Sequence, residues 1–155
     1  MKYNQSTMKT QIGISLLELL LTLAITATIL VASMRFFGVA NENAKVSNAV
    51  TMIHEISDAS FKWYESHPQF DTTKFTLANL VAMQLLPNKY KEPDNLNPWG
   101  GSVAIEGSGE HFNVSMTNVA IKSCNMLEGK FYEFPPSDNN FCVCEKATCV
   151  FTVRF

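Results

Sequence analysis

The stretch that decides the fold is "QIGISLLELLLTLAITATILVASMRFF", residues 11–37, which contains one long apolar run. From Ile14 to Met34 the run holds 21 residues without proline or glycine, and its one charged residue is Glu18. As a helix, these residues span roughly 30 Å at about 1.5 Å per residue, which matches the hydrocarbon core of a bilayer. The sequence therefore predicts a membrane-spanning helix.

The residues on either side of the run indicate its orientation. Lys2 and Lys9 precede it in a leader without acidic residues, and Arg35 follows it directly. The positive-inside rule then places the N-terminus in the cytoplasm and the rest of the chain on the other side of the membrane. The run is too long for the apolar region of an ordinary secretory signal, and no small-x-small cleavage site ends it.

The carboxylate of Glu18 needs a partner in such a segment. A charged side chain in the middle of a membrane helix costs roughly 2.5–3.5 kcal/mol on insertion scales, and the span holds no lysine, arginine or histidine. A cut between Gly13 and Ile14 would create a cationic α-amine one helical turn before Glu18. That amine could pair with Glu18 of the same chain or of a neighbouring copy.

These residues resemble a known family. The sequence "GISLLELLLTLAI" is similar to the class III leader junction of type IV pilins and type II secretion pseudopilins, in which Gly13, Ile14 and Glu18 match the motif. The resemblance implies that a membrane aspartyl protease, the prepilin peptidase, cuts after Gly13 and methylates the new N-terminus. The family most often has phenylalanine or methionine at the first mature position, so Ile14 departs from the common pattern.

The resemblance also implies partners and a location. The partners would be the prepilin peptidase, other pilin subunits, the inner-membrane assembly machinery and the membrane itself. The precursor would cross the inner membrane once with its N-terminus in the cytoplasm, and then enter an extracellular filament, or a periplasmic one if the chain is a pseudopilin. No cofactor is expected. With a net charge of -2 and no basic stripe, the chain is not expected to bind nucleic acid.

The helical pattern continues beyond the apolar run. Small and apolar residues recur at helical spacing up to residue 65, and the stripe consists of Val46, Ala49, Val50, Ile53, Ile56, Ser57, Ser60 and Trp63. We expect this stripe to pack on a globular domain. Three segments are therefore predicted: a cleaved leader at 1–13, a transmembrane or filament-core helix at 14–35, and a pilin globular domain at 36–155.

Shorter elements are predicted in the globular domain. We expect a helix at 75–86, a hairpin of strands 102–106 and 111–116 joined through Gly107 and Gly109, and a helix at 119–128 stopped by Gly129. Residues 130–134 and 149–155 are predicted to be later strands. The expected fold class is α+β and pilin-like, with a long N-terminal α-helix, membrane-spanning in its first half, packed on a small antiparallel β-sheet.

A turn motif extends the resemblance. In "NPWGG", Pro98 restricts the backbone, Trp99 can fill the core between helix and sheet, and Gly100 and Gly101 permit a turn with positive φ. The segments "LLPNKYKEPDNLNPWGGSVAI" and "FNVSMTNVAIKSC" resemble type IVb pilins of the thin-pilus kind. The role expected for this turn is structural.

The four cysteines, Cys124, Cys142, Cys144 and Cys149, indicate disulfides formed in an oxidising compartment. A Cys142–Cys144 bond would close a very tight ring, so we expect Cys124 to pair with Cys142 or Cys144 and the remaining one to pair with Cys149. A four-cysteine zinc site is disfavoured because the ligand spacing is poor.

Three classes of function follow from these observations. The first is a structural pilin subunit for adhesion, motility, DNA transfer or secretion. The alternative is a type II secretion pseudopilin or minor pilin. A membrane-anchored enzyme is disfavoured because no nucleophile, paired-carboxylate or metal pattern is recognisable in the sequence.

Overall fold

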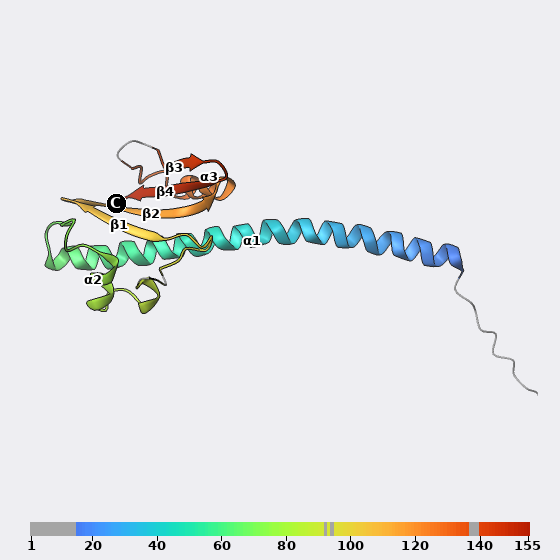
Figure 1. Ribbon diagram of the computed structural model, residues 1–155, viewed down its shortest axis with the longest axis horizontal. Coiled ribbons are helices and arrows are strands. Elements are labelled where there is room, and N and C mark those ends of the chain that lie inside the picture. The colour runs from blue at the N-terminus through green and yellow to red at the C-terminus, as the bar shows by residue number, and fades with distance from the viewer. Residues whose placement is uncertain (1–14, 92, 94, 137–139) are drawn as a thin grey trace, which may run out of the picture. The chain divides into compact units, whose positions relative to one another are not determined.

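The computed structural model describes residues 15–91, 93, 95–136 and 140–155 (Figure 1). It shows an α+β fold in which a long N-terminal helix packs on a small antiparallel sheet, so the predicted fold class is confirmed. The elements, in chain order, are α1 (Leu16–Ser66), α2 (Leu77–Ala82), the 3₁₀ turn η1 (Asn88–Tyr90), β1 (Val103–Ser108), β2 (His111–Ala120), α3 (Ile121–Phe131), β3 (Cys142–Glu145) and β4 (Thr148–Arg154).

The described chain forms two units that meet within α1. The first ends at Val39, and the second, the C-terminal unit, runs from Ala40 to Phe155 and contains the sheet and the shorter helices. The helix has one glycine, Gly38, next to this boundary.

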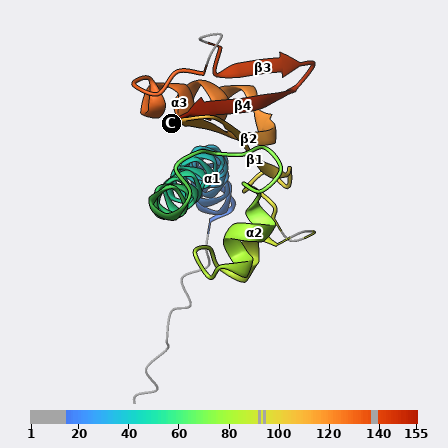
Figure 2. The same cartoon turned by 90° about the vertical axis from the view of Figure 1, so that its left-hand side faces the viewer.

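The core of the C-terminal unit is built on one face of α1. The buried residues of the helix are Val46, Ala49, Ile53, Ile56, Ser57, Ala59, Ser60 and Trp63, which is the predicted stripe with Ala59 added and with Val50 only partly buried. The apolar side chains of this face share one buried core with residues of the sheet, α2 and α3. Viewed along the helix, Figure 2 shows the sheet and α3 on one side of this half of α1 and α2 on another.

The sheet has four antiparallel strands in the order β1-β2-β4-β3. Strand β2 alternates between buried and less buried positions, and its inward side chains Phe112, Val114 and Met116 join the core. Strand β3 lies at one edge of the sheet (Figure 1).

The predicted β1–β2 hairpin is present, but its turn is shorter than expected. Ser108 pairs with His111, so Gly107 lies within β1 and only Gly109, with φ of +65°, belongs to the turn. Gly107 is required in the strand because a Cβ there would lie 2.7 Å from the Phe70 carbonyl oxygen.

The helix predicted at 75–86 is much shorter in the structure. Thr76 has extended backbone angles, and its hydroxyl oxygen accepts a hydrogen bond from the Asn79 amide, which starts α2 at Leu77. The helix ends at Ala82 because Gln84 adopts a φ of +59°, and the chain then turns Leu86 into the core. The helix ends early because the chain turns to bury Leu86, and the sequence periodicity that predicted the helix contains no information on that contact.

The predictions around residues 119–134 are wrong in two respects. Val119 belongs to β2, where it pairs with Cys149, and Gly129 lies inside α3 instead of stopping it. Residues 130–134 do not form a strand, because α3 continues to Phe131 and buries that ring in the core. The edge strand β3, which pairs with β4 on the side away from β2, was not predicted.

A polar contact attaches η1 to α1. The Tyr90 hydroxyl donates a hydrogen bond of 2.6 Å to the Glu55 carboxylate, and the Lys89 ammonium lies 2.7 Å from the same carboxylate. Burial first, and then the Glu55 carboxylate, raise the pKa of the Tyr90 phenol far above its ordinary value. The hydrogen bonds from Lys89 and Tyr90 lower the pKa of Glu55.

We predict that Tyr90→Phe lowers the free energy of unfolding by about 1 kcal/mol, because the hydrogen bond is lost while Glu55 keeps Lys89. In the unmodified chain the unfolded phenol ionises near pH 10 and the folded one does not, so stability falls as pH rises above about 10. Tyr90→Phe removes that part of the alkaline loss. Chemical unfolding as a function of pH measures both effects.

The matched control for this prediction is Tyr132→Phe, because the Tyr132 side chain is 67% exposed and its hydroxyl contacts the neighbouring Glu133. This control should change stability little. Equal losses in the two variants would contradict the importance of the Glu55–Tyr90 contact.

Candidate functional site

The surface of α1 before Ala40 is almost wholly apolar and exposed within the described chain. One helix, α1, is long and apolar enough to cross a membrane, as the sequence predicted. Its exposed large apolar side chains in this part are Leu16, Leu17, Leu19, Leu20, Leu21, Leu23, Ile25, Ile29, Leu30, Val31, Met34, Phe36, Phe37 and Val39. We call this the apolar helix surface.

The hydroxyl groups on this surface add little polarity to it. Each Ser or Thr side chain between Leu16 and Val39 donates a hydrogen bond to a carbonyl of the preceding turn. The donors and acceptors are Thr22 to Leu19, Thr26 to Thr22 and Leu23, Thr28 to Ile25, and Ser33 to Ile29, at 2.7–3.0 Å. Since their protons are already satisfied, these side chains can face an apolar environment at low cost.

Glu18 lies in the first turn of α1 and is exposed. Its position near the helix N-terminus is favourable for a negative charge, because the helix dipole is positive there. No ion pair or hydrogen bond of its carboxylate occurs among the residues that the structure describes. Gly13 and Ile14, the predicted processing residues, lie outside the described residues.

The predicted turn at Pro98–Gly101 is held by Asn97, which was not singled out from the sequence. The Asn97 side-chain oxygen accepts hydrogen bonds from the Trp99 and Gly101 amides at 2.9 and 3.1 Å, and its amide group donates to the Thr117 carbonyl at 2.7 Å. An asparagine before a proline-containing turn is a known signal for such an arrangement.

The two glycines of this turn have different requirements. Gly100 has a φ of +77°, and its Cα faces open space. Gly101 is buried, and a Cβ there would collide with the Thr117 carbonyl, the same group that Asn97 holds. The turn therefore needs one glycine for its backbone angles and the other for a close backbone approach.

The side chain of Glu42 joins three segments of the C-terminal unit. One carboxylate oxygen accepts hydrogen bonds from the Trp99 indole at 3.2 Å and the Ser123 hydroxyl at 2.8 Å, and the other lies 3.2 Å from the Lys45 ammonium. The bond from Ser123 first, and then that from Trp99, lower the pKa of the Glu42 carboxyl. Trp99 is thus partly buried beside the core with its nitrogen bonded to α1.

The four cysteines form two disulfides, Cys124–Cys142 and Cys144–Cys149. This is one of the two pairings that the sequence left open. The first joins α3 to β3, and the second joins β3 to β4 next to their hairpin turn.

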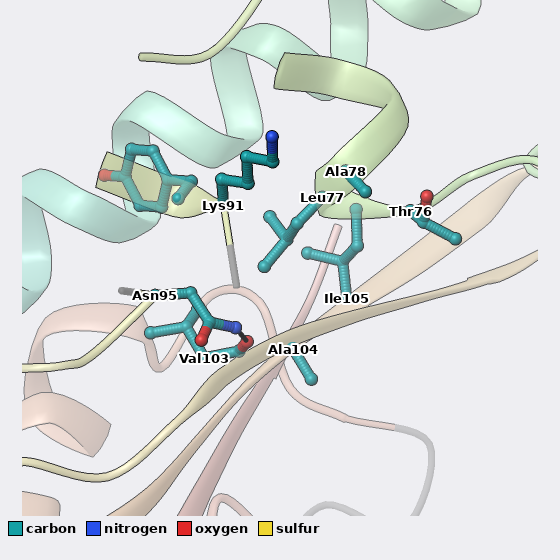
Figure 3. Close-up of a pocket in the computed structure, with 9 residues that line it drawn as sticks. Thr76, Leu77, Ala78, Lys91, Asn95, Val103, Ala104 and Ile105 are labelled. Atoms are coloured by element: carbon teal, nitrogen blue, oxygen red, sulfur yellow. Dashed lines mark hydrogen bonds between the residues drawn. The ribbon is translucent and has the colours of Figure 1, made fainter. Parts of the chain in front are cut away.

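A pocket of about 410 Å³ lies between α2, η1 and β1, and Figure 3 shows Leu77, Val103 and Ile105 forming much of its wall. Three of its polar groups are already engaged: the Asn95 amide donates to the Val103 carbonyl at 2.9 Å, Thr76 caps α2, and Tyr90 bonds to Glu55. The Lys91 side chain also lines the pocket, and no acid or nucleophile of the described lining accompanies it. The lining therefore lacks the convergent free acid, base and nucleophile that chemistry in this pocket would require.

No group of histidine, cysteine or carboxylate side chains able to hold a metal ion occurs in the part of the chain that is described. The arrangement that stands out is therefore the apolar helix surface, which is exposed and carries one carboxylate, Glu18, in its first turn and one basic side chain, Arg35, near its other end. Such a face is suited to contact with lipid or with other protein helices.

We predict opposite effects for two glycine-to-alanine changes. Gly101→Ala should lower the free energy of unfolding by about 3 kcal/mol, because the new methyl group displaces the Thr117 carbonyl. Gly129→Ala should raise it by about 0.5–1 kcal/mol, because Gly129 lies inside α3 with open space beside it. Thermal or chemical unfolding measures both, and a neutral Gly101→Ala would contradict the described turn.

We also predict that Glu42 stabilises the fold in a pH-dependent way. A carboxyl whose pKa is lowered in the folded chain stabilises it above the ordinary pKa of 4.5, and this contribution is lost as pH falls through the folded value. Glu42→Ala should cost about 1 kcal/mol at neutral pH, because the Ser123 and Trp99 donors lose their acceptor while the partly exposed site admits water. Glu42→Gln should keep an acceptor but reduce the loss of stability in acid.

Unfolding followed by tryptophan fluorescence from neutral pH to about pH 3 tests this prediction. Glu128→Gln, which changes an exposed carboxylate on α3, is the control and should leave the acid profile unchanged. An identical acid profile for Glu42→Gln and the unmodified chain would show that Glu42 does not contribute.

Comparison with known protein families and with curated proteins finds no match to this chain.

Proposed function

We propose that the chain is a structural subunit of a type IV pilus or a related filament. In this proposal the precursor crosses the membrane once through α1, the leader is removed between Gly13 and Ile14, and the subunits then assemble through their N-terminal helices. The single observation that carries the proposal is the apolar helix surface with one carboxylate in its first turn.

The size of this apolar surface indicates that lipid or other protein helices contact it. Burying a large apolar side chain is worth roughly 1.5–3 kcal/mol, so the exposed side chains between Leu16 and Val39 together represent tens of kcal/mol. That is more than the roughly 5–15 kcal/mol by which a domain is usually stable. Water is therefore a poor environment for this helix, whereas lipid and packed helices of other copies both suit it.

Glu18 supports assembly in preference to simple anchoring. An anchor helix gains nothing from a carboxylate, which at the centre of a membrane helix would cost roughly 2.5–3.5 kcal/mol. In a filament, the α-amine created at Ile14 would offer a positive partner, and pairing between copies would favour one axial stagger. Contacts that join different surfaces of successive copies do not close on themselves, so they produce a helical fibre.

Leader removal would also change the charge of the chain. The formal charge of -2 includes Lys2 and Lys9, so the mature chain would carry -2 minus 2, or -4. The mature helix would then keep Arg35 as its one basic side chain between Ile14 and Val39, at the end of the apolar run.

We predict that Glu18→Val leaves membrane insertion intact but strongly reduces the recovery of filaments, because the variant helix is more apolar but lacks the docking charge. The matched control is Thr22→Val, which removes a polar group one turn later on the same helix face and should leave filaments near normal. Shearing filaments from cells that contain the peptidase and assembly machinery, followed by electron microscopy and immunoblotting, measures the outcome.

Mass spectrometry of the N-terminus tests the processing step directly. The proposal requires a mature chain that starts at a methylated Ile14. A chain that keeps residues 1–13 in the presence of the peptidase would contradict it, as would normal filaments from Glu18→Val.

A further inference from the structure

The two disulfides of the C-terminal unit differ in how far solvent reaches them. Cys124 is fully buried and its partner Cys142 is half-buried, whereas Cys144 is exposed and only its partner Cys149, at 1%, is buried. A thiolate opens a disulfide by attacking one sulfur from outside, so access to at least one of the cysteines controls the rate. The Cys144–Cys149 bridge is the more accessible of the two.

The two bridges also differ in how much the fold depends on them. The Cys124–Cys142 bridge joins residues 18 apart and ties α3 to the edge strand β3, whereas the Cys144–Cys149 bridge joins residues only 5 apart. A cross-link that closes a short loop restricts the unfolded chain less than one that closes a long loop. Opening the short bridge therefore removes less stability.

The backbone around the short bridge holds its two cysteines together without the covalent bond. Cys144 and Cys149 are direct partners in the β3–β4 ladder, and the pairs on either side, Val143 with Val150 and Glu145 with Thr148, are also in register. The Thr152 amide further donates to the Phe141 carbonyl just before β3. The hairpin can thus survive reduction and present the two thiols ready to close again.

We propose that the Cys144–Cys149 bridge is a thiol–disulfide exchange site, and that the Cys124–Cys142 bridge is structural. The reactant is a dithiol. Its first thiolate attacks the sulfur of Cys144, forming a mixed disulfide, and the sulfur of Cys149 leaves as a thiolate that takes up a proton. The second thiol of the reactant then loses its proton and displaces the sulfur of Cys144, which leaves as a thiolate and takes up a proton. The bridge is thereby reduced by two electrons, and the dithiol is oxidised to its own disulfide.

This proposal does not depend on the assignment as a filament subunit, because it rests only on the C-terminal unit. The reactant could be a small dithiol or a cysteine pair of a protein, and both use the same chemistry. A single thiol would stop at the mixed disulfide on Cys144 and leave Cys149 free, which makes that intermediate detectable by its added mass.

The test is graded reduction of the full chain in detergent, with alkylation of the free thiols and peptide mapping by mass spectrometry. We expect Cys144 and Cys149 to be alkylated while Cys124 and Cys142 are still bridged and the circular dichroism spectrum is still that of the folded chain. Separate arms use dithiothreitol, reduced glutathione and a thioredoxin-type protein dithiol. Opening by dithiothreitol alone assigns the site to small dithiols, and opening by the protein dithiol as well extends it to protein partners.

Two paired variants provide the controls. Cys144→Ala with Cys149→Ala should leave the reduction rate of the other bridge unchanged. Both double variants should have a larger equilibrium constant for unfolding than the unmodified chain. The increase for this variant should be roughly sixfold smaller than for Cys124→Ala with Cys142→Ala, because the effect on the constant scales with the three-halves power of the loop length. If the second double variant does not fold, the mapping of the unmodified chain decides alone. Simultaneous opening of both bridges, earlier opening of Cys124–Cys142, or no opening before unfolding would overturn the proposal.

Discussion

The stripe of small and apolar side chains on α1 between Val46 and Trp63 is the surface on which the C-terminal unit depends. Ala49, Ile53 and Ile56 on this stripe are fully buried against side chains of the sheet and of α3. Large rings such as Phe112 and Phe151 from the sheet are buried in the same core as this stripe. The same helix thus supplies six of the 24 buried apolar core residues of the described chain, while its earlier turns supply none.

Polar contacts on the flanks of this stripe position the loops instead of driving the folding. Glu42 holds the indole of Trp99 and the hydroxyl of Ser123, and Glu55 holds the phenol of Tyr90. Each such contact is worth about 1 kcal/mol, which is small beside the apolar burial around it. These contacts mainly determine position: they fix where the turn at Pro98–Gly101 and the segment η1 meet the helix.

The two proposals concern two parts of the chain that differ in their chemistry. The apolar helix surface has almost no reactive groups, and the function proposed for it is association, with lipid first and with other copies later. The β3–β4 hairpin carries the disulfide of the exchange proposal, in which the strand ladder holds the hairpin together when that bond opens. A chain exposed to an oxidising environment could therefore keep its packed core while one bridge exchanges.

The sequence by itself determined the long helix, its buried stripe, the β1–β2 hairpin and the last strand, because each has a period or turn signal contained in neighbouring residues. It also marked Glu18 as unusual. Only the tertiary structure decided that α3 runs through Gly129, that Phe131 enters a helix and the core, and that β3 forms the edge strand. Only the tertiary structure, likewise, brought Glu42 to Trp99 and Ser123, which lie 57 and 81 residues away along the chain. Contacts over such separations depend on which surfaces bury one another, and no local pattern in the chain records that.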